Sequence, residues 1–401
     1  MVDRPGPFAG DGDALQTVQG RTVSGVLRRQ WPTGGVVLGS GALLAGFYWE
    51  HVRGNSLPGI AGMEPVDWLL GFAVLAGIGM VATLARRPRR AWLYARRLRK
   101  RPIALVSTAA TGLLLLVGLF GPVFVSEPAD IVFSRAWLPP VGATIDTQFL
   151  NGPCPGQVVD GRCRGTLRYP LGTTRAGKSL LPFVVLGART AVEIAAVTAL
   201  VLVPIGVGVG LISGMVGGWT DAVLMRVADV LGTLPALVVY ILFWEWNAEY
   251  RLLVLILAFG LVNWGGLARS VRNETLELRE RSFVRAARLS GASRLTLARR
   301  HLLPNVSRQV FSTLALQVPL LVATEAALSF VVLPSPMGEG TLGDPTVISW
   351  GQLIYVGVQT DGLVPAWWVT VVPTLALVLA TLSLAAFWRS MSDIVAPVCG
   401  S

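Results

Sequence analysis

Long apolar runs without charged residues constrain the fold of this chain more than any other feature. Residues 103–125 contain no charged side chain, and a helix that crosses a bilayer needs about 20 apolar residues. The chain is 53% hydrophobic and only 14% charged, whereas charged residues make up about a quarter of a soluble domain. We therefore predict an all-α polytopic membrane protein embedded in a lipid bilayer.

The apolar runs predict how the chain is organised. The candidate spans are residues 36–49, 68–85, 103–125, 191–216, 223–243, 252–268, 310–333 and 364–388. The last six form an expected membrane domain at 103–401, and the first two lie in an N-terminal extension at 34–102. Whether those two cross is left open, since 36–49 is short and Gly-rich. Residues 1–33 are polar and lack the apolar core of a signal peptide, so we expect a disordered cytoplasmic tail.

The basic residues predict the orientation. The net charge is +11, and residues 86–101 hold nine basic residues with no acid among them. Lys and Arg concentrate in cytoplasmic loops. If this cluster is cytoplasmic, counting spans places 126–180 outside, the Arg-rich stretch 270–308 inside, and both termini in the cytoplasm. This bias explains the charge better than nucleic-acid binding does.

Two cysteines lie in the predicted external loop. Cys154 and Cys163 flank a Pro/Gly-rich stretch, and disulfides persist outside the cytoplasm. We expect a disulfide here, with two unpaired thiols as the alternative. A metal site is not expected, because His51 and His301 are the only histidines and neither is near this pair.

Residues 172–179, GTTRAGKS, match the P-loop pattern GxxxxGK[ST]. A working P-loop follows a buried strand and needs an acidic residue elsewhere to hold magnesium. Tyr169 and Pro170 interrupt any preceding strand, and the segment lies in the predicted external loop. We expect no nucleotide or other cofactor here.

A basic, helix-forming segment at residues 283–305, FVRAARLSGASRLTLARRHLLPN, separates two of the spans. Gly291 lies near its middle and Pro304 near its end. A glycine interrupts a helical pattern cheaply where the chain must turn. We predict two short helices that meet at a bend and dock into a groove of a soluble partner.

This segment resembles the EAA loop of importer-type ABC permeases. Arg285-Ala286-Ala287, Gly291 and residues 301–305 have that loop's spacing, and the ending is similar to the dipeptide/oligopeptide/nickel subfamily. In that family the loop forms the coupling helix that seats in an ATPase subunit. The resemblance implies that the coupling residues here are Arg285, Ala286, Ala287, Gly291, His301, Leu303, Pro304 and Asn305. Arg285 stands where the family usually has Glu.

Other motifs follow in the family's order over roughly residues 103–397. Residues 171–178 resemble LGTDxxGRD, 325–330 (EAALSF) resemble EASLSF, and 349–351 (SWG) and GARTAVEIA at 187–195 are similar to further family motifs. The resemblance implies a bacterial inner-membrane importer for peptides or similar solutes. Its partners would be a second homologous permease subunit, two ATPase subunits and an extracytoplasmic substrate-binding protein.

Charged residues within the spans are candidates for special roles, because each costs about 2.5–3.5 kcal/mol to insert at a helix centre. Glu325 and Glu193 are the candidates for lining the transport pathway, with helix packing as the alternative. Arg226 and Asp229, three residues apart, are expected to form a mutual ion pair.

Two other functions remain open from the sequence. One is a permease for another solute in a specialised system, which the substitution at Arg285 and the N-terminal extension favour. The other is a secondary transporter without an ATPase, although we find no convincing internal repeat of the kind that such transporters carry. We expect no catalytic activity, because no constellation of catalytic side chains is evident.

Overall fold

The computed structural model describes residues 38–52, 64–126, 131–244, 250–331, 348–361 and 365–395, so the predicted tail at 1–33 lies outside the described residues. The described chain forms two units, one with residues 38–52 and 74–88 and the other with 64–73 and 89 onward. In the first, a helix at 38–47 continues into the π-helix η1 (Tyr48–Val52). There Gly39 packs against Leu75 of helix α2 (Pro65–Ala85), since a Cβ on Gly39 would lie 3.0 Å from Leu75 Cδ1.

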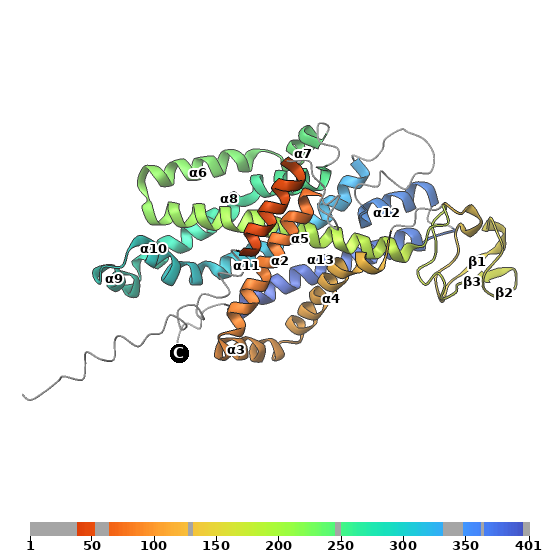
Figure 1. Ribbon diagram of the computed structural model, residues 1–401, viewed down its shortest axis with the longest axis horizontal. Helices are drawn as coiled ribbons and strands as arrows, with labels where there is room; N and C mark the ends of the chain where they lie inside the picture. Colours follow the sequence, from red (N-terminus) through yellow and green to blue (C-terminus); the bar gives the residue numbers. More distant parts are fainter. Residues whose placement is uncertain are drawn as a thin grey trace, which may run out of the picture. The chain divides into compact units, whose positions relative to one another are not determined.

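The second unit is built mainly of helices (Figure 1). They are α3 (Pro88–Arg99), α4 (Pro102–Phe124), α5 (Leu180–Val216), α6 (Gly218–Thr233), α7 (Ala236–Trp244), α8 (Arg251–Glu280), α9 (Ser282–Leu289), α10 (Arg294–Leu297), η5 (Ala298–Leu302), α11 (Leu303–Val331), α12 (Trp350–Val356), η6 (Gly357–Asp361) and α13 (Trp368–Val395). Within the described residues, α2, α4, α5, α8, α11 and α13 contain segments long and apolar enough to cross a membrane. The prediction of an all-α polytopic membrane protein is confirmed.

A row of glycines brings α5 and α8 into close contact. Gly206, Gly210 and Gly214 are spaced four residues apart on α5 and so share one face. A Cβ on Gly206 would lie 2.8 Å from Leu267 Cδ2, one on Gly210 2.7 Å from Val271 Cβ, and one on Gly214 2.7 Å from Thr275 Cβ. Small residues at this spacing let membrane helices approach closely, where van der Waals packing drives their association.

The contacts between α5 and α8 fix the direction of both helices. The residue numbers on α5 and those of their contacts on α8 increase in the same direction, from Gly206 against Leu267 to Gly214 against Thr275. The two helices therefore run parallel. The intervening α6–α7 pair must therefore return the chain across the same thickness. The sequence predicted one span at 223–243, but the structure bends this pair by 72°. Leu234 is extended, with φ −73° and ψ 127°, because the residue before a proline avoids the helical region, and Pro235 is that proline.

The predicted first span, 36–49, is not among these candidate spans. Its residues 36 and 37 lie outside the described chain, and the helix at 38–47 is too short to qualify by itself. α5 also begins well before residue 191, where the sequence placed its start. Its 37 residues extend about 55 Å at 1.5 Å per residue, which exceeds the roughly 30 Å hydrocarbon core.

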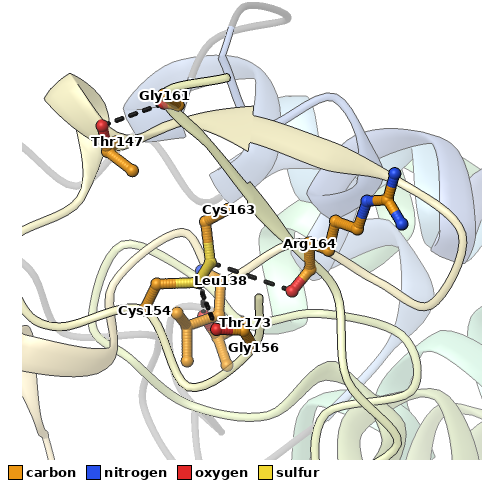
Figure 2. Close-up of a disulfide and its surroundings, with 8 residues drawn as sticks. All are labelled: Leu138, Thr147, Cys154, Gly156, Gly161, Cys163, Arg164 and Thr173. Atoms are coloured by element: carbon orange, nitrogen blue, oxygen red, sulfur yellow. Dashed lines mark hydrogen bonds between the residues drawn. A yellow bond between two sulfur atoms is a disulfide. The ribbon is translucent and has the colours of Figure 1, made fainter. Parts of the chain in front are cut away.

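Residues between α4 and α5 form a small folded region with a three-stranded antiparallel sheet. Its strands, β1 (Thr144–Asp146), β2 (Val158–Val159) and β3 (Arg162–Arg164), lie in the order β1-β3-β2. Asp160 (φ 52°) and Gly161 (φ 74°) form the two-residue turn between β2 and β3, a pair that favours such hairpins. Cys154 and Cys163 form a disulfide that closes the region (Figure 2).

The P-loop-like residues belong to this same region and do not offer a phosphate cradle. A P-loop binds phosphates with free backbone amides. Here the amide of Gly172 donates to Tyr169 O, that of Thr173 to Leu138 O and that of Gly177 to Thr174 O. Trp368 Nε1 also donates to Thr173 O at 3.1 Å, so the segment is a structural turn that holds the start of α13.

Two ends of the larger unit are thus defined by contacts (Figure 1). At one end the sheet region joins the starts of α5 and α13. At the other, Arg279 of α8 donates to Gly214 O at 2.7 Å, Ser392 of α13 donates to Arg308 O at 3.2 Å, and Arg101 pairs with Asp393 at 2.6 Å. The two Arg-rich stretches therefore lie at the same end, opposite the disulfide.

Replacing Gly210 by valine should destabilise the fold by about 1–3 kcal/mol, because the new side chain would overlap Val271 and the carbonyl of Ala268. Gly208 is the matched control, since a Cβ there meets nothing within 4 Å. Thermal unfolding in detergent should give a lower Tm for G210V than for G208V. Equal melting temperatures would contradict the close packing of α5 on α8.

Candidate functional site

The segment at 283–305, called the coupling segment from here on, consists of α9, α10 and η5 and leads directly into α11. Gly291 has φ +78°, a left-handed conformation that glycine adopts without strain. The amide of Ala292 donates to Ala287 O across this turn, a Schellman-type helix end with Gly291 at the glycine position. Ser293 then caps α10 by accepting a hydrogen bond from the amide of Thr296. The two helices and the bend have the arrangement that the sequence predicted.

The buried side of the coupling segment rests on the ends of α5 and α8. Val284, Leu297 and Leu302 are at most 4% exposed. With Met215 of α5 and Arg279 of α8, they line a cavity of about 340 Å³. These contacts place the segment where its movement would reach both long helices.

The outward side combines apolar and basic side chains. Leu289 is 91% exposed, Leu295 59% and Phe283 43%, and Arg285 and Ala286 are exposed on α9. A soluble protein surface that buried these apolar side chains would gain free energy from their removal from water. The arrangement therefore suits a partner with an apolar groove and complementary acidic charge.

The remaining predicted coupling residues lie at the junction with α11. Pro304 lacks a backbone donor, and the chain just before it adopts the wider π-helical turn η5, in which the amide of Leu303 donates to Ala298 O. Asn305 Nδ2 donates to His301 O at 2.6 Å. All eight residues expected here lie on the coupling segment, with Leu303 and Pro304 exposed and His301 partly covered.

Three motifs far apart in the sequence meet at a second location, called the motif cluster. Ser349 caps α12 and hydrogen-bonds to the Glu325 carboxylate of α11. Thr190 of α5 donates to Ile348 O at 2.8 Å. Trp350 Nε1 donates to Val184 O at 3.0 Å, and a Cβ on Gly187 would lie 2.5 Å from Trp350 Cδ1.

The motif cluster joins GARTAVEIA of α5, EAALSF of α11 and Ser-Trp-Gly of α12. Gly187 is required because the Trp350 ring lies directly against its backbone. The short helix α12 is therefore fixed to two spanning helices at once, and Glu325 bonds its N-cap residue, Ser349.

Glu193 belongs to a separate ion cluster beside the motif cluster. Arg189 pairs with Glu193 at 2.7 Å and also with Asp67 of α2. The Glu193 and Asp67 side chains are 9% and 14% exposed. The sequence interpretation missed Arg189 and Asp67. The four-residue spacing of Arg189 and Glu193 was a usable signal, but the contact with Asp67 has no local pattern.

The predicted ion pair between Arg226 and Asp229 is wrong. Asp229 pairs with Arg269 of α8 at 2.9 Å, because α6 packs along α8 and brings a basic residue of a neighbouring helix within reach. About two turns earlier on α6, Asp221 pairs with Arg272 at 2.5 Å and accepts a hydrogen bond from Ser213. Along this contact, the acidic side chains of α6 pair with arginines of α8 and not with a basic residue on their own helix.

Comparison with known proteins identifies a family whose matched region contains most of these motifs. The profile of the family described as "Binding-protein-dependent transport system inner membrane component" matches residues 206–397, which contain the coupling segment, the Glu325 motif and Ser-Trp-Gly. The oligopeptide transport system permease protein OppC of Mycobacterium tuberculosis is 35% identical over 216 residues, 53% of this chain and 70% of that protein. The chain belongs to the peptide family of ABC importer permeases.

Other relatives of this permease carry similar names. The dipeptide transport system permease protein DppC of Lactococcus lactis is 33% identical over 230 residues, 57% of this chain. OppC of Haemophilus influenzae is 35% identical over 208 residues, 52% of this chain. The matched regions span 64% and 63% of those two relatives. This permease is therefore a multi-pass protein of an inner-membrane transport family.

Replacing Arg189 by methionine should lower stability by up to about 3 kcal/mol, because it leaves two largely buried carboxylates without their counter-charge. Adding Asp67→Asn and Glu193→Gln should restore much of the loss, since both charges are then gone. Thermal unfolding of wild type, R189M and the triple variant in detergent measures this. A triple variant no more stable than R189M would contradict the ion cluster.

Proposed function

We propose that this chain is the transmembrane permease subunit of an ATP-driven importer for peptides or similar small solutes. Family membership supports this proposal most directly, because the matched residues include the coupling segment. The names of the relatives, dipeptide and oligopeptide transport permeases, support peptides as the substrate class. The chain itself carries out no ATP hydrolysis in this scheme, which separate ATPase subunits would perform.

The coupling segment would transmit the movement of an ATPase subunit. Its outward face, with Phe283, Leu289 and Leu295, would seat in a groove of that subunit. Its inward face rests on α5 and α8, and η5 continues into α11 without a break, so a displacement would reach three spanning helices. Such coupling requires an element whose position both ATP-bound and ATP-free states can bias.

The other end would face outside and receive the substrate. The disulfide-closed sheet region would lie on that side, near an extracytoplasmic substrate-binding protein. A second, homologous permease subunit would complete the pathway, and a second ATPase subunit would bind that partner. Both chain termini would be cytoplasmic.

Glu325 would act as a hinge contact on this pathway. It connects α11, which the coupling segment moves directly, to α12 through Ser349. Glu193, already paired with Arg189, is the weaker candidate for lining the pathway in this conformation.

Replacing Gly291 by proline should abolish recovery of ATPase subunits with the tagged permease. Proline fixes φ near −65°, which is incompatible with the +78° observed at Gly291. The matched control is Gly291→Asn, since asparagine tolerates left-handed backbone. Mild-detergent co-purification with mass spectrometry and an ATPase assay measures both. Normal ATPase recovery with G291P, or no ATPase recovery with wild type, would refute the proposed coupling.

Replacing Arg285 by glutamate should weaken the ATPase subunit's affinity roughly 5- to 10-fold at low salt, if this exposed arginine meets acidic charge on the partner. The difference should shrink near 0.5 M salt, because salt screens exposed charges. Arg89→Glu is the control, since Arg89 is exposed on α3 outside the coupling segment. If R285E bound the ATPase subunit more tightly than wild type, that subunit would favour the glutamate that the family usually has at this position. This result would contradict an acidic partner surface opposite Arg285.

A further inference from the structure

A groove with a basic rim opens at the same end as the coupling segment. It lies between the start of α4, the first turns of α11 and the last turns of α13, and encloses about 1260 Å³. We call it the α13 groove. Its residues take no part in the coupling segment, the motif cluster or the Arg189 ion cluster.

The groove exists because small side chains form its floor. Ala385 and Ala386 of α13 line it, with Leu382 and Arg389 on the same helical face. On one side of α13, Thr111 of α4 donates to Ser383 O at 3.2 Å. On the other, α11 packs along α13, where Phe311 stacks on Trp388. The two helices leave the alanine floor uncovered between them.

The walls of the groove are apolar and its rim is basic. Ile103 of α4 is 73% exposed and Leu316 of α11 is 71% exposed, and both line the groove. The rim holds Lys100, Arg101, Arg308 and Arg389. One of these four, Arg101, forms an ion pair with the carboxylate of Asp393.

The other three rim residues are available to an anion. Among the residues that the structure describes, no carboxylate forms an ion pair with Lys100, Arg308 or Arg389. Lys100 lies in the turn between α3 and α4, Arg308 on α11 and Arg389 on α13, and all three line the same groove. The opening lies where the helices that cross the membrane begin or end, as expected for the level of lipid headgroups.

We propose that the α13 groove binds an anionic phospholipid. The phosphate would contact Lys100, Arg308 and Arg389, and an acyl chain would lie along Ile103, Leu316 and the alanine floor. Basic pockets between membrane helices on the cytoplasmic side recognise acidic headgroups in this way. A free phosphate would use the rim but leave the apolar walls exposed. The proposal does not depend on which solute the permease carries.

The test uses the purified, delipidated transporter and native mass spectrometry. Dioleoyl phosphatidylglycerol and dioleoyl phosphatidylcholine are titrated separately into wild type, the double variant Arg308→Gln with Arg389→Gln, and the control Arg89→Gln with Arg99→Gln. The control removes the same charge from α3, outside the groove. Wild type and control should bind phosphatidylglycerol in preference to phosphatidylcholine, and the groove variant should bind it roughly 10- to 30-fold more weakly.

A second variant, Leu316→Trp, fills the groove without changing its charge and should also reduce phosphatidylglycerol binding. Equal binding of the two lipids, or undiminished binding to both groove variants, would overturn the proposal. Displacement of the lipid by millimolar inorganic phosphate would assign the rim to a soluble anion instead. A photo-crosslinker at Leu316 should capture lipid, and capture of the partner permease subunit would identify the groove as a subunit interface.

Discussion

The close approach of α5 and α8 is the contact on which the rest of this permease depends. A bilayer offers no hydrophobic driving force between helices, so association relies on packing. Gly206, Gly210 and Gly214 remove the side chains that would hold the helices apart. The parallel contact that results forces α6 and α7 to return across the membrane, and it places the end of α8 beside the end of α5, where the coupling segment can rest on both.

The same arrangement separates two ends with different chemistry. One end carries a disulfide, a small sheet and the turn at residues 172–179 that holds the start of α13. The other carries both Arg-rich stretches, the coupling segment and the α13 groove. A displacement at the coupling segment can reach the motif cluster through α11, because Glu325 on that helix holds Ser349 at the start of α12. This connection is our physical basis for proposing that ATPase movement alters access to a pathway.

Local sequence patterns predicted those features that depend on local physics. Apolar runs predicted the spans because a bilayer imposes length and hydrophobicity on each helix separately. Gly291 predicted the bend because its conformation is a property of one residue. The break at Pro235 was readable in principle, because a proline interrupts the helical pattern there, but residues 223–243 are apolar enough over most of their length to predict a single span. Asp160-Gly161 similarly marked a hairpin that was read only as a Pro/Gly-rich loop.

Features that depend on helix packing could not be predicted in this way. The Arg226–Asp229 pair was inferred from spacing, yet Asp229 pairs with Arg269 because α6 lies along α8. Asp67 and Arg189 are 122 residues apart, and nothing in either neighbourhood indicates the contact. The motif cluster was predicted in part. Each of its motifs is recognisable in the sequence, but their order along the chain does not reveal that Trp350 lies against Gly187.

The arrangement of the two ends across a membrane can be tested with one labelling measurement. Single cysteines replace Leu167, 85% exposed in the sheet region, and Leu289, 91% exposed in the coupling segment, in a Cys399→Ser background. A membrane-impermeant maleimide is applied to spheroplasts and to inside-out vesicles. We expect Cys at 167 to react in spheroplasts alone and Cys at 289 in inside-out vesicles alone. Labelling of both positions from the same side would contradict the account.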